Sequence, residues 1–159
     1  MARRIYIIEP HPAVRESFRF LVGPMANLTI VGTAATYKSA MHDLSRKKPD
    51  IVLMGLAGAS DAPIRALRSQ CPDARILVAT AFQTGLTPSV AQEAGADICV
   101  SRAYGAPSLL PSLRKIAGTL NRPALHPMER DVSFADSPRV PPTCAADSIS
   151  ASERLHPAD

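Results

Sequence analysis

The sequence predicts a single doubly wound α/β domain, in which helices cover both faces of a parallel β-sheet. Five short runs of β-branched and aliphatic residues lie between residues 4 and 121, and each has the length and composition of a buried strand. Each run is followed by apolar residues at helical spacing. Strands that alternate with helices indicate right-handed crossovers between parallel neighbours. The alternation stops after Arg122.

The first two strands are expected at Ile5–Ile8 and Leu28–Gly32, since both runs are short and apolar. The helix between them should end at Gly23-Pro24, because glycine and proline stop helices. Its inward face carries four apolar residues, namely Val14, Phe18, Leu21 and Val22. Thr36 is suited to an N-cap, so the second helix is expected over Tyr37–Lys47.

The remaining strands are expected at Asp50–Gly55, Arg75–Thr80 and Asp97–Ser101. They are largely apolar, as in a sheet that is covered on both faces. Asp61 is expected to cap the helix after the third strand, and Thr87-Pro88 to begin the helix after the fourth.

The last helix carries a row of apolar residues, which are Leu109, Leu110, Leu113, Ile116 and Leu120. Pro111 fits its first turn if Ser108 is the cap, and would kink the helix if the helix began earlier. Residues 123–159 contain six prolines, several serines and few large apolar residues. We therefore expect a folded domain over residues 1–122 and a disordered or loosely attached tail over residues 123–159.

Composition and charge argue against several classes of protein. The apolar runs are too short for a membrane span, and the N-terminus lacks the pattern of a signal peptide. Cys71, Cys99 and Cys144 have no metal-binding spacing, which favours reduced thiols in the cytoplasm. Residues through Arg122 include 15 Lys and Arg against 8 Asp and Glu, which we interpret as a solvated basic surface. No motif of an enzyme is present, so neither catalysis nor a cofactor is expected.

Five segments follow one another in the order of a known family. They are Ile8-Glu9-Pro10-His11-Pro12-Ala13-Val14-Arg15, Ile30–Ala34, Lys48–Met54, Ile76–Ala81 and Ala94–Asp97. The set covers about residues 4–120 and resembles the receiver domains of two-component response regulators, specifically the LuxR-type subfamily. The resemblance implies a flavodoxin-like sheet with strand order 2-1-3-4-5. It also implies transfer of a phosphoryl group from a histidine kinase to an aspartate at the end of the third strand, with Mg²⁺ held by carboxylates.

The resemblance assigns the positions of a phosphorylation site, and most of them carry a different residue in this chain. They are Glu9 and Pro10 for the two acids, Gly55 for the phosphoryl acceptor, Thr80 for the hydroxyl, Cys99 for the aromatic switch and Arg102 for the lysine. Gly55 has no nucleophile and Pro10 has no carboxylate, so we expect a degenerate site that is not phosphorylated on aspartate and holds no metal. Asp61 is better explained as a helix cap than as a replacement acceptor.

Some residues of this site have two interpretations. Glu9 and Arg102 either form an ion pair across the end of the sheet or are solvated independently. The Thr80 hydroxyl is either a remnant of a switch or, as we favour, a partner of the backbone at the end of a strand. Cys99 is most simply a small core residue, and His11 a structural one.

The leading functional hypothesis is a pseudo-receiver that acts by protein–protein contact without phosphorylation. The expected face comprises Thr87–Glu93, Ser101–Tyr104 and the exposed side of Ser108–Arg114. On this face Arg102, Tyr104 and Arg114 are candidate anchors, because Tyr and Arg are enriched at binding hot spots. A sensor kinase, another response regulator or a second copy of the chain could be the partner.

Two alternatives stay open. The vacated site could bind a small ligand or nucleotide, or the chain could be a decayed regulator that has lost its DNA-binding output domain. No pattern of a helix-turn-helix domain follows Pro123, so direct sequence-specific DNA binding is not expected.

Overall fold

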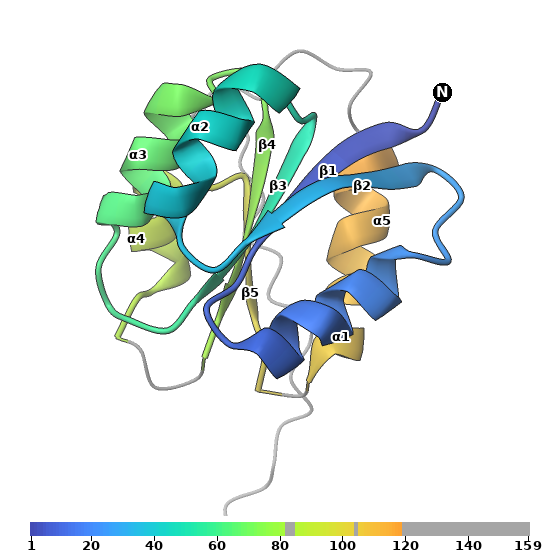
Figure 1. Ribbon diagram of the computed structural model, residues 1–159. Coiled ribbons are helices and arrows are strands. Elements are labelled where there is room, and N and C mark those ends of the chain that lie inside the picture. Colours follow the sequence, from blue (N-terminus) through green and yellow to red (C-terminus); the bar gives the residue numbers. More distant parts are fainter. Residues whose placement is uncertain (82–84, 104, 119–159) are drawn as a thin grey trace, which may run out of the picture.

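The computed structural model describes residues 1–81, 85–103 and 105–118. Its centre is a five-stranded parallel sheet with the order β2-β1-β3-β4-β5, shown in Figure 1. The strands are β1 (Arg3–Ile8), β2 (Leu28–Ala34), β3 (Ile51–Leu56), β4 (Arg75–Thr80) and β5 (Ile98–Ser101). The predicted fold class and strand order are therefore confirmed. The predicted boundary at residue 122 and the predicted tail lie outside the described residues.

Helices cover both faces of this sheet. They are α1 (Pro12–Val22), α2 (Tyr37–Lys47), α3 (Ala62–Gln70), α4 (Pro88–Glu93) and α5 (Leu110–Gly118), the last preceded by a 3₁₀ turn, η1 (Ala106–Leu109). Figure 1 shows α1 and α5 on one face and α2, α3 and α4 on the other. Within the described part of the chain, no helix combines the length and the apolarity that crossing a membrane would require.

The core consists of one apolar layer on each face of the sheet, and the strands supply both layers by alternation. In β1, Ile5 and Ile7 pack in the cluster that includes Phe18 of α1 and residues of α5. Tyr6 and Ile8 pack in the cluster that includes Leu44 of α2 and residues of α3 and α4. Strands β3 and β4 are buried along their whole length, which explains why their sequences are almost continuously apolar.

Side chains cap two helices, at Thr36 as the sequence predicts and at Thr87, where the sequence predicts the start of a helix. The hydroxyl oxygen of Thr36 accepts a hydrogen bond from the backbone N–H of Ser39 at 3.1 Å, and Thr87 accepts one from Val90 at 3.3 Å. Asp61 stands at the N-cap of α3 but makes no side-chain capping bond. Its carboxylate instead pairs with Arg65 at 2.8 Å, so the predicted capping role of Asp61 is wrong in this respect.

The start of the last helix differs in detail from the conditional prediction. Ser108 lies inside η1 rather than at a cap, and its hydroxyl donates to the carbonyl of Gly105 at 2.7 Å. The 3₁₀ turn leads directly into α5, whose second residue is Pro111. Proline is tolerated there because an N–H in the first turn has no partner within the helix.

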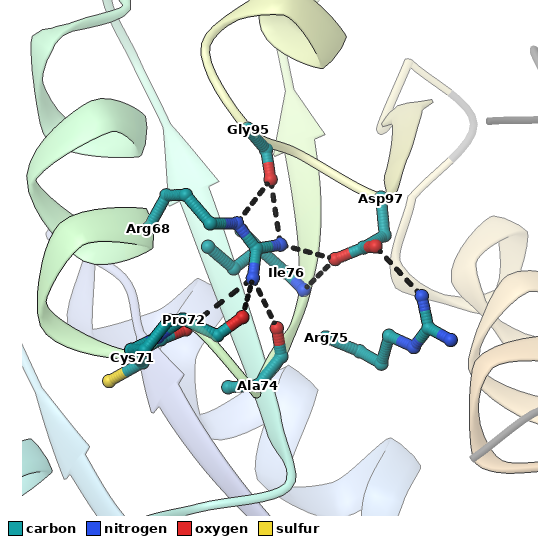
Figure 2. Close-up of polar contacts among 8 residues, drawn as sticks. All are labelled: Arg68, Cys71, Pro72, Ala74, Arg75, Ile76, Gly95 and Asp97. Carbon is teal, nitrogen blue, oxygen red and sulfur yellow. Dashed lines mark hydrogen bonds and ion pairs between the residues drawn. The ribbon is translucent and has the colours of Figure 1, made fainter. Parts of the chain in front are cut away.

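Arg68 ties together the edge of the sheet at which β4 and β5 begin (Figure 2). Its guanidinium donates to the carbonyls of Gly95, Pro72 and Ala74 at 2.8 Å each and to Asp97 at 2.6 Å. Asp97 also accepts from the side chain of Arg75 and from the backbone N–H of Ile76. We refer to Arg68, Arg75, Gly95 and Asp97 as the Arg68 cluster. It joins the end of α3 to the start of β4 and to the connection between α4 and β5.

Candidate functional site

The residues that the resemblance assigns to a phosphorylation site lie at the opposite edge, where the strands end. Glu9 directly follows β1, Gly55 is the fifth residue of β3, Thr80 ends β4 and Arg102 directly follows β5. Because neighbouring parallel strands end at the same edge, residues far apart in sequence converge there. The pairing of Ile8 with Met54 places the next two residues, Glu9 and Gly55, beside each other.

Glu9 and Arg102 form a buried ion pair. The Glu9 side chain has no exposed surface and the Arg102 side chain is 14% exposed, with Nη1 2.6 Å from Oε2 of Glu9. The other carboxylate oxygen, Oε1, accepts the backbone N–H of His11 at 3.0 Å and lies 3.0 Å from its Nδ1. The interpretation as an ion pair is thus confirmed, and independent solvation of the two side chains is wrong.

The Glu9 carboxylate occupies the space beside Gly55. A Cβ atom added to Gly55 would lie 1.6 Å from Oε2 of Glu9 and 2.7 Å from its Cδ. The same Cβ would be 3.4 Å from Nη1 of Arg102. A side chain at position 55 would therefore overlap the space that the ion pair occupies.

The donor set at this edge does not fit the Mg²⁺ ion that the resemblance associates with the fold. Mg²⁺ requires octahedral oxygen ligands, usually including one or two carboxylates. Of the three assigned positions Glu9, Pro10 and Gly55, only Glu9 carries a carboxylate, and both of its oxygens already have partners. In the described ranges, no group of three or more His, Cys, Asp and Glu side chains is arranged to hold a metal ion.

Thr80 and Cys99 lie together on the face covered by α2, α3 and α4. Thr80 is buried, and Cys99 packs against the apolar cluster of that face. Burial raises the pKa of the Cys99 thiol, while a hydrogen bond with the Thr80 side chain opposes this shift. Cys99 is thus a small core residue, as expected. The backbone partner expected for the Thr80 hydroxyl stays a prediction.

Of the three candidate anchors of an interaction face, Arg102 and Arg114 lie within the described residues. The guanidinium of Arg102 is taken up by Glu9, and Tyr104 lies outside the described residues. Arg114 is exposed on α5 and lines a hollow of about 450 Å³ between α1 and α5, together with Phe20, Leu21, Pro24, Met25, Asn27 and Leu110. Arg102 as an anchor stays a prediction, and its Nη1 atom is already bonded to Glu9.

Sequence reasoning missed two partners of Glu9. His11 holds Oε1, and Nη1 of Arg15 donates to the backbone carbonyl of Glu9 at 2.6 Å. His11 directly precedes α1, and Arg15 lies in its first turn. Both are close to Glu9 in sequence, and this closeness could have indicated the contacts.

Comparisons with known proteins agree with this fold. No protein-family model matches the chain. The chain is 33% identical over 96 residues to the uncharacterized transcriptional regulatory protein YhcZ of Bacillus subtilis. The matched residues make up 58% of this chain and 45% of YhcZ. It is 25% identical over 117 residues to the response regulator GacA of Pseudomonas aeruginosa, covering 71% of this chain and 54% of GacA. The chain thus spans about half the length of these relatives.

Solved structures give the same class. A LuxR-family two-component response regulator from Aurantimonas sp. SI85-9A1 superposes with a TM-score of 0.66 at 29% identity, covering 80% of this chain and 92% of that chain. The response regulator domain of Thermotoga maritima CheB superposes with a TM-score of 0.65 at 16% identity, covering 78% of this chain and all of that chain. The described domain therefore has the receiver fold, and its relatives and structural neighbours are response regulators and their receiver domains.

Proposed function

We propose that this chain is a receiver-type signalling domain that is not phosphorylated on aspartate and acts by contact with another protein. The observation that carries the proposal is the Glu9–Arg102 ion pair beside Gly55, since it fills the space in which an acceptor side chain would stand. Gly55 itself offers no carboxylate. A phosphoryl group would therefore find neither a nucleophile nor room at this position.

Glu9 is a poor replacement for the missing nucleophile. A carboxylate attacks phosphorus through a free oxygen, and catalysis of phosphoryl transfer depends on positioning and on neutralising the transferred group. One oxygen of Glu9 is bonded to Arg102 and the other to His11. Attack by either oxygen would first require breaking a contact of a fully buried charge, which is costly.

The proposed contact face comprises α4, the end of β5 and the exposed side of α5. Val90 of α4 supports this assignment, because it is a large apolar side chain with 39% of its surface exposed. The partner would be a sensor kinase, another response regulator or a second copy of this chain. Relatives of the chain are named as a transcriptional regulatory protein and a response regulator.

The arrangement of Glu9 and Arg102 argues against a ligand in the vacated site. The side chains of Glu9 and Arg102 occupy the space beside Gly55 and satisfy each other's charge. A ligand would have to displace a buried ion pair rather than enter an empty pocket. No observation favours the decayed-regulator alternative.

Incubation with acetyl phosphate and Mg²⁺, followed by intact-mass measurement, tests the first part of the proposal. We expect no phosphoryl adduct on this chain under conditions in which a phosphorylatable receiver domain becomes fully modified. Recovery of an acid-stable and base-labile adduct on any aspartate or on Glu9 would contradict the proposal.

A further inference from the structure

We infer that Glu9, Gly55 and Arg102 form one interlock, in which the Glu9 carboxylate is a built-in anion that requires glycine at position 55. Gly55 is then more than a lost acceptor. It is the residue that makes room for the ion pair. The inference concerns the coupling of three residues within the folded chain, and this coupling does not depend on the proposed function.

Glu9 cannot easily move away from a side chain at position 55. A clash with the far end of a flexible side chain is usually relieved by rotation of that side chain. Here Oε1 and Oε2 are both bonded, and the side chain is fully buried. Rotation of the carboxylate alone would also leave Cδ 2.7 Å from the added Cβ.

Separating the Glu9 carboxylate from Arg102 also costs free energy. A buried ion that loses its partner is strongly destabilising, because the remaining charge stays in a poorly solvating environment. A methyl group at position 55 would push Glu9 away from Arg102 and so incur this cost, in addition to the overlap itself. Arg102 and Glu9 are 93 residues apart in sequence, so the interlock joins the ends of strands β1, β3 and β5.

Backbone hydrogen bonds of Arg102 link the ion pair to the connection after β5. The backbone N–H of Arg102 donates to the carbonyl of Thr80 at 2.8 Å, and the carbonyl of Arg102 accepts from Gly105 at 3.0 Å. The ion pair therefore holds the residue from which the connection to η1 begins. Glu9 would thereby set the arrangement of the contact face without a phosphoryl group. This consequence rests on the proposed function, whereas the coupling of the three residues does not.

A double-mutant cycle of unfolding temperatures tests the interlock. The variants are Gly55→Ala, Glu9→Asp and the combination of the two, because Asp keeps the charge but withdraws the carboxylate by one methylene group. Gly58→Ala is the matched control, since a Cβ at Gly58 would meet nothing within 4 Å. We expect Gly55→Ala to lower the unfolding temperature by at least about 5 °C relative to Gly58→Ala. In the Glu9→Asp background the same substitution should cost less than half as much.

Two results would overturn the interlock. One is a Gly55→Ala protein as stable as Gly58→Ala, and the other is a pair of losses that simply add. If Gly55→Ala does not fold, a folded Glu9→Asp/Gly55→Ala protein supports the inference, and an unfolded one contradicts it, because the shorter arm should relieve the overlap.

A second measurement separates this inference from the proposed function. Backbone amide signals of Arg102, Ala103 and Gly105 in the wild-type chain should not shift with Mg²⁺ and beryllofluoride. A specific shift would contradict the proposed function and leave the cycle valid, whereas additive losses would remove the interlock and leave the proposed function in place.

Discussion

Glu9 has one methylene group more than the aspartate that the resemblance expects after the first strand. The longer arm lets its carboxylate reach across the strand ends to Gly55 and Arg102, where Oε2 is bonded at 2.6 Å. The presence of arginine in place of lysine suits this role, because a guanidinium is always charged and well matched to a carboxylate. At the scale of single residues, the site is thus rebuilt around an internal ion pair.

Removing the arginine should reveal the strength of this pair. We expect Arg102→Met to lower the free energy of unfolding by about 3 kcal/mol, because the carboxylate of Glu9 stays buried without its charged partner. Arg114→Met is the control at an exposed arginine of α5, and it should change stability by no more than about 0.5 kcal/mol. Urea unfolding followed by circular dichroism measures both. Equal effects of the two substitutions would be incompatible with a stabilising pair.

At the scale of elements, polar contacts hold the two edges of the sheet in different ways. The edge where the strands end depends on Glu9 and Arg102. The edge where β4 and β5 begin depends on the Arg68 cluster, in which a single guanidinium satisfies carbonyls from two connections (Figure 2). Gly95 belongs there because its φ of +119° suits glycine, and because a Cβ would lie 2.8 Å from the Arg68 side chain.

Arg68→Ala should therefore destabilise the fold strongly, although an arginine on a helix would be expected at the surface from sequence alone. We expect a loss of about 1.5 to 3 kcal/mol, as for hydrogen bonds that involve a charged group. Arg65→Ala, four residues from its partner Asp61 and 60% exposed, should cost no more than about 0.5 kcal/mol. Chemical denaturation of both variants measures the difference, and a similar cost at the two positions would refute a special role for Arg68.

At the scale of the whole molecule, one apolar cluster lies on each face of the sheet in the part of the chain that the structure describes. Among the helices that the structure describes, large apolar side chains are exposed at Phe20 of α1, with 82% of its surface, and at Val90 of α4, with 39%. These two helices lie on different faces of the sheet (Figure 1). The two side chains provide a way to locate the proposed contact without disturbing the core.

Affinity capture from native lysate with the chain and its surface variants tests the proposed contact face. We expect Val90→Ser to reduce recovery of a reproducible partner several-fold, and Phe20→Ser to leave it unchanged. A chain shortened after Arg122 should capture the same partner, since the proposed face lies within the domain. Loss of capture with Phe20→Ser alone would contradict the proposed face and place the contact at α1. Recovery of no partner by any form would argue against an interaction module.

Much of the fold could be predicted from the sequence, and some parts of the site could not. Strand β4 and helix α2 have the predicted bounds, because a buried strand and a capped helix have strong local signals. The Arg68 cluster was not predicted, because its bonds to Gly95 and Asp97 span 27 and 29 residues. The sequence gives only a conditional prediction for the start of α5, because a 3₁₀ turn before a helix has no distinct apolar period.

The sequence by itself determined which chemical groups are present at the strand ends: no side chain at Gly55, no carboxylate at Pro10, and a guanidinium at Arg102. Only the tertiary structure decided where these groups lie relative to one another. Parallel pairing of β1 with β3 places Glu9 beside Gly55, and the position of β5 brings Arg102 within 2.6 Å of the same carboxylate. Such distances depend on register and packing between strands that are remote in sequence. For this reason the sequence left the pairing of Glu9 with Arg102 as one of two alternatives.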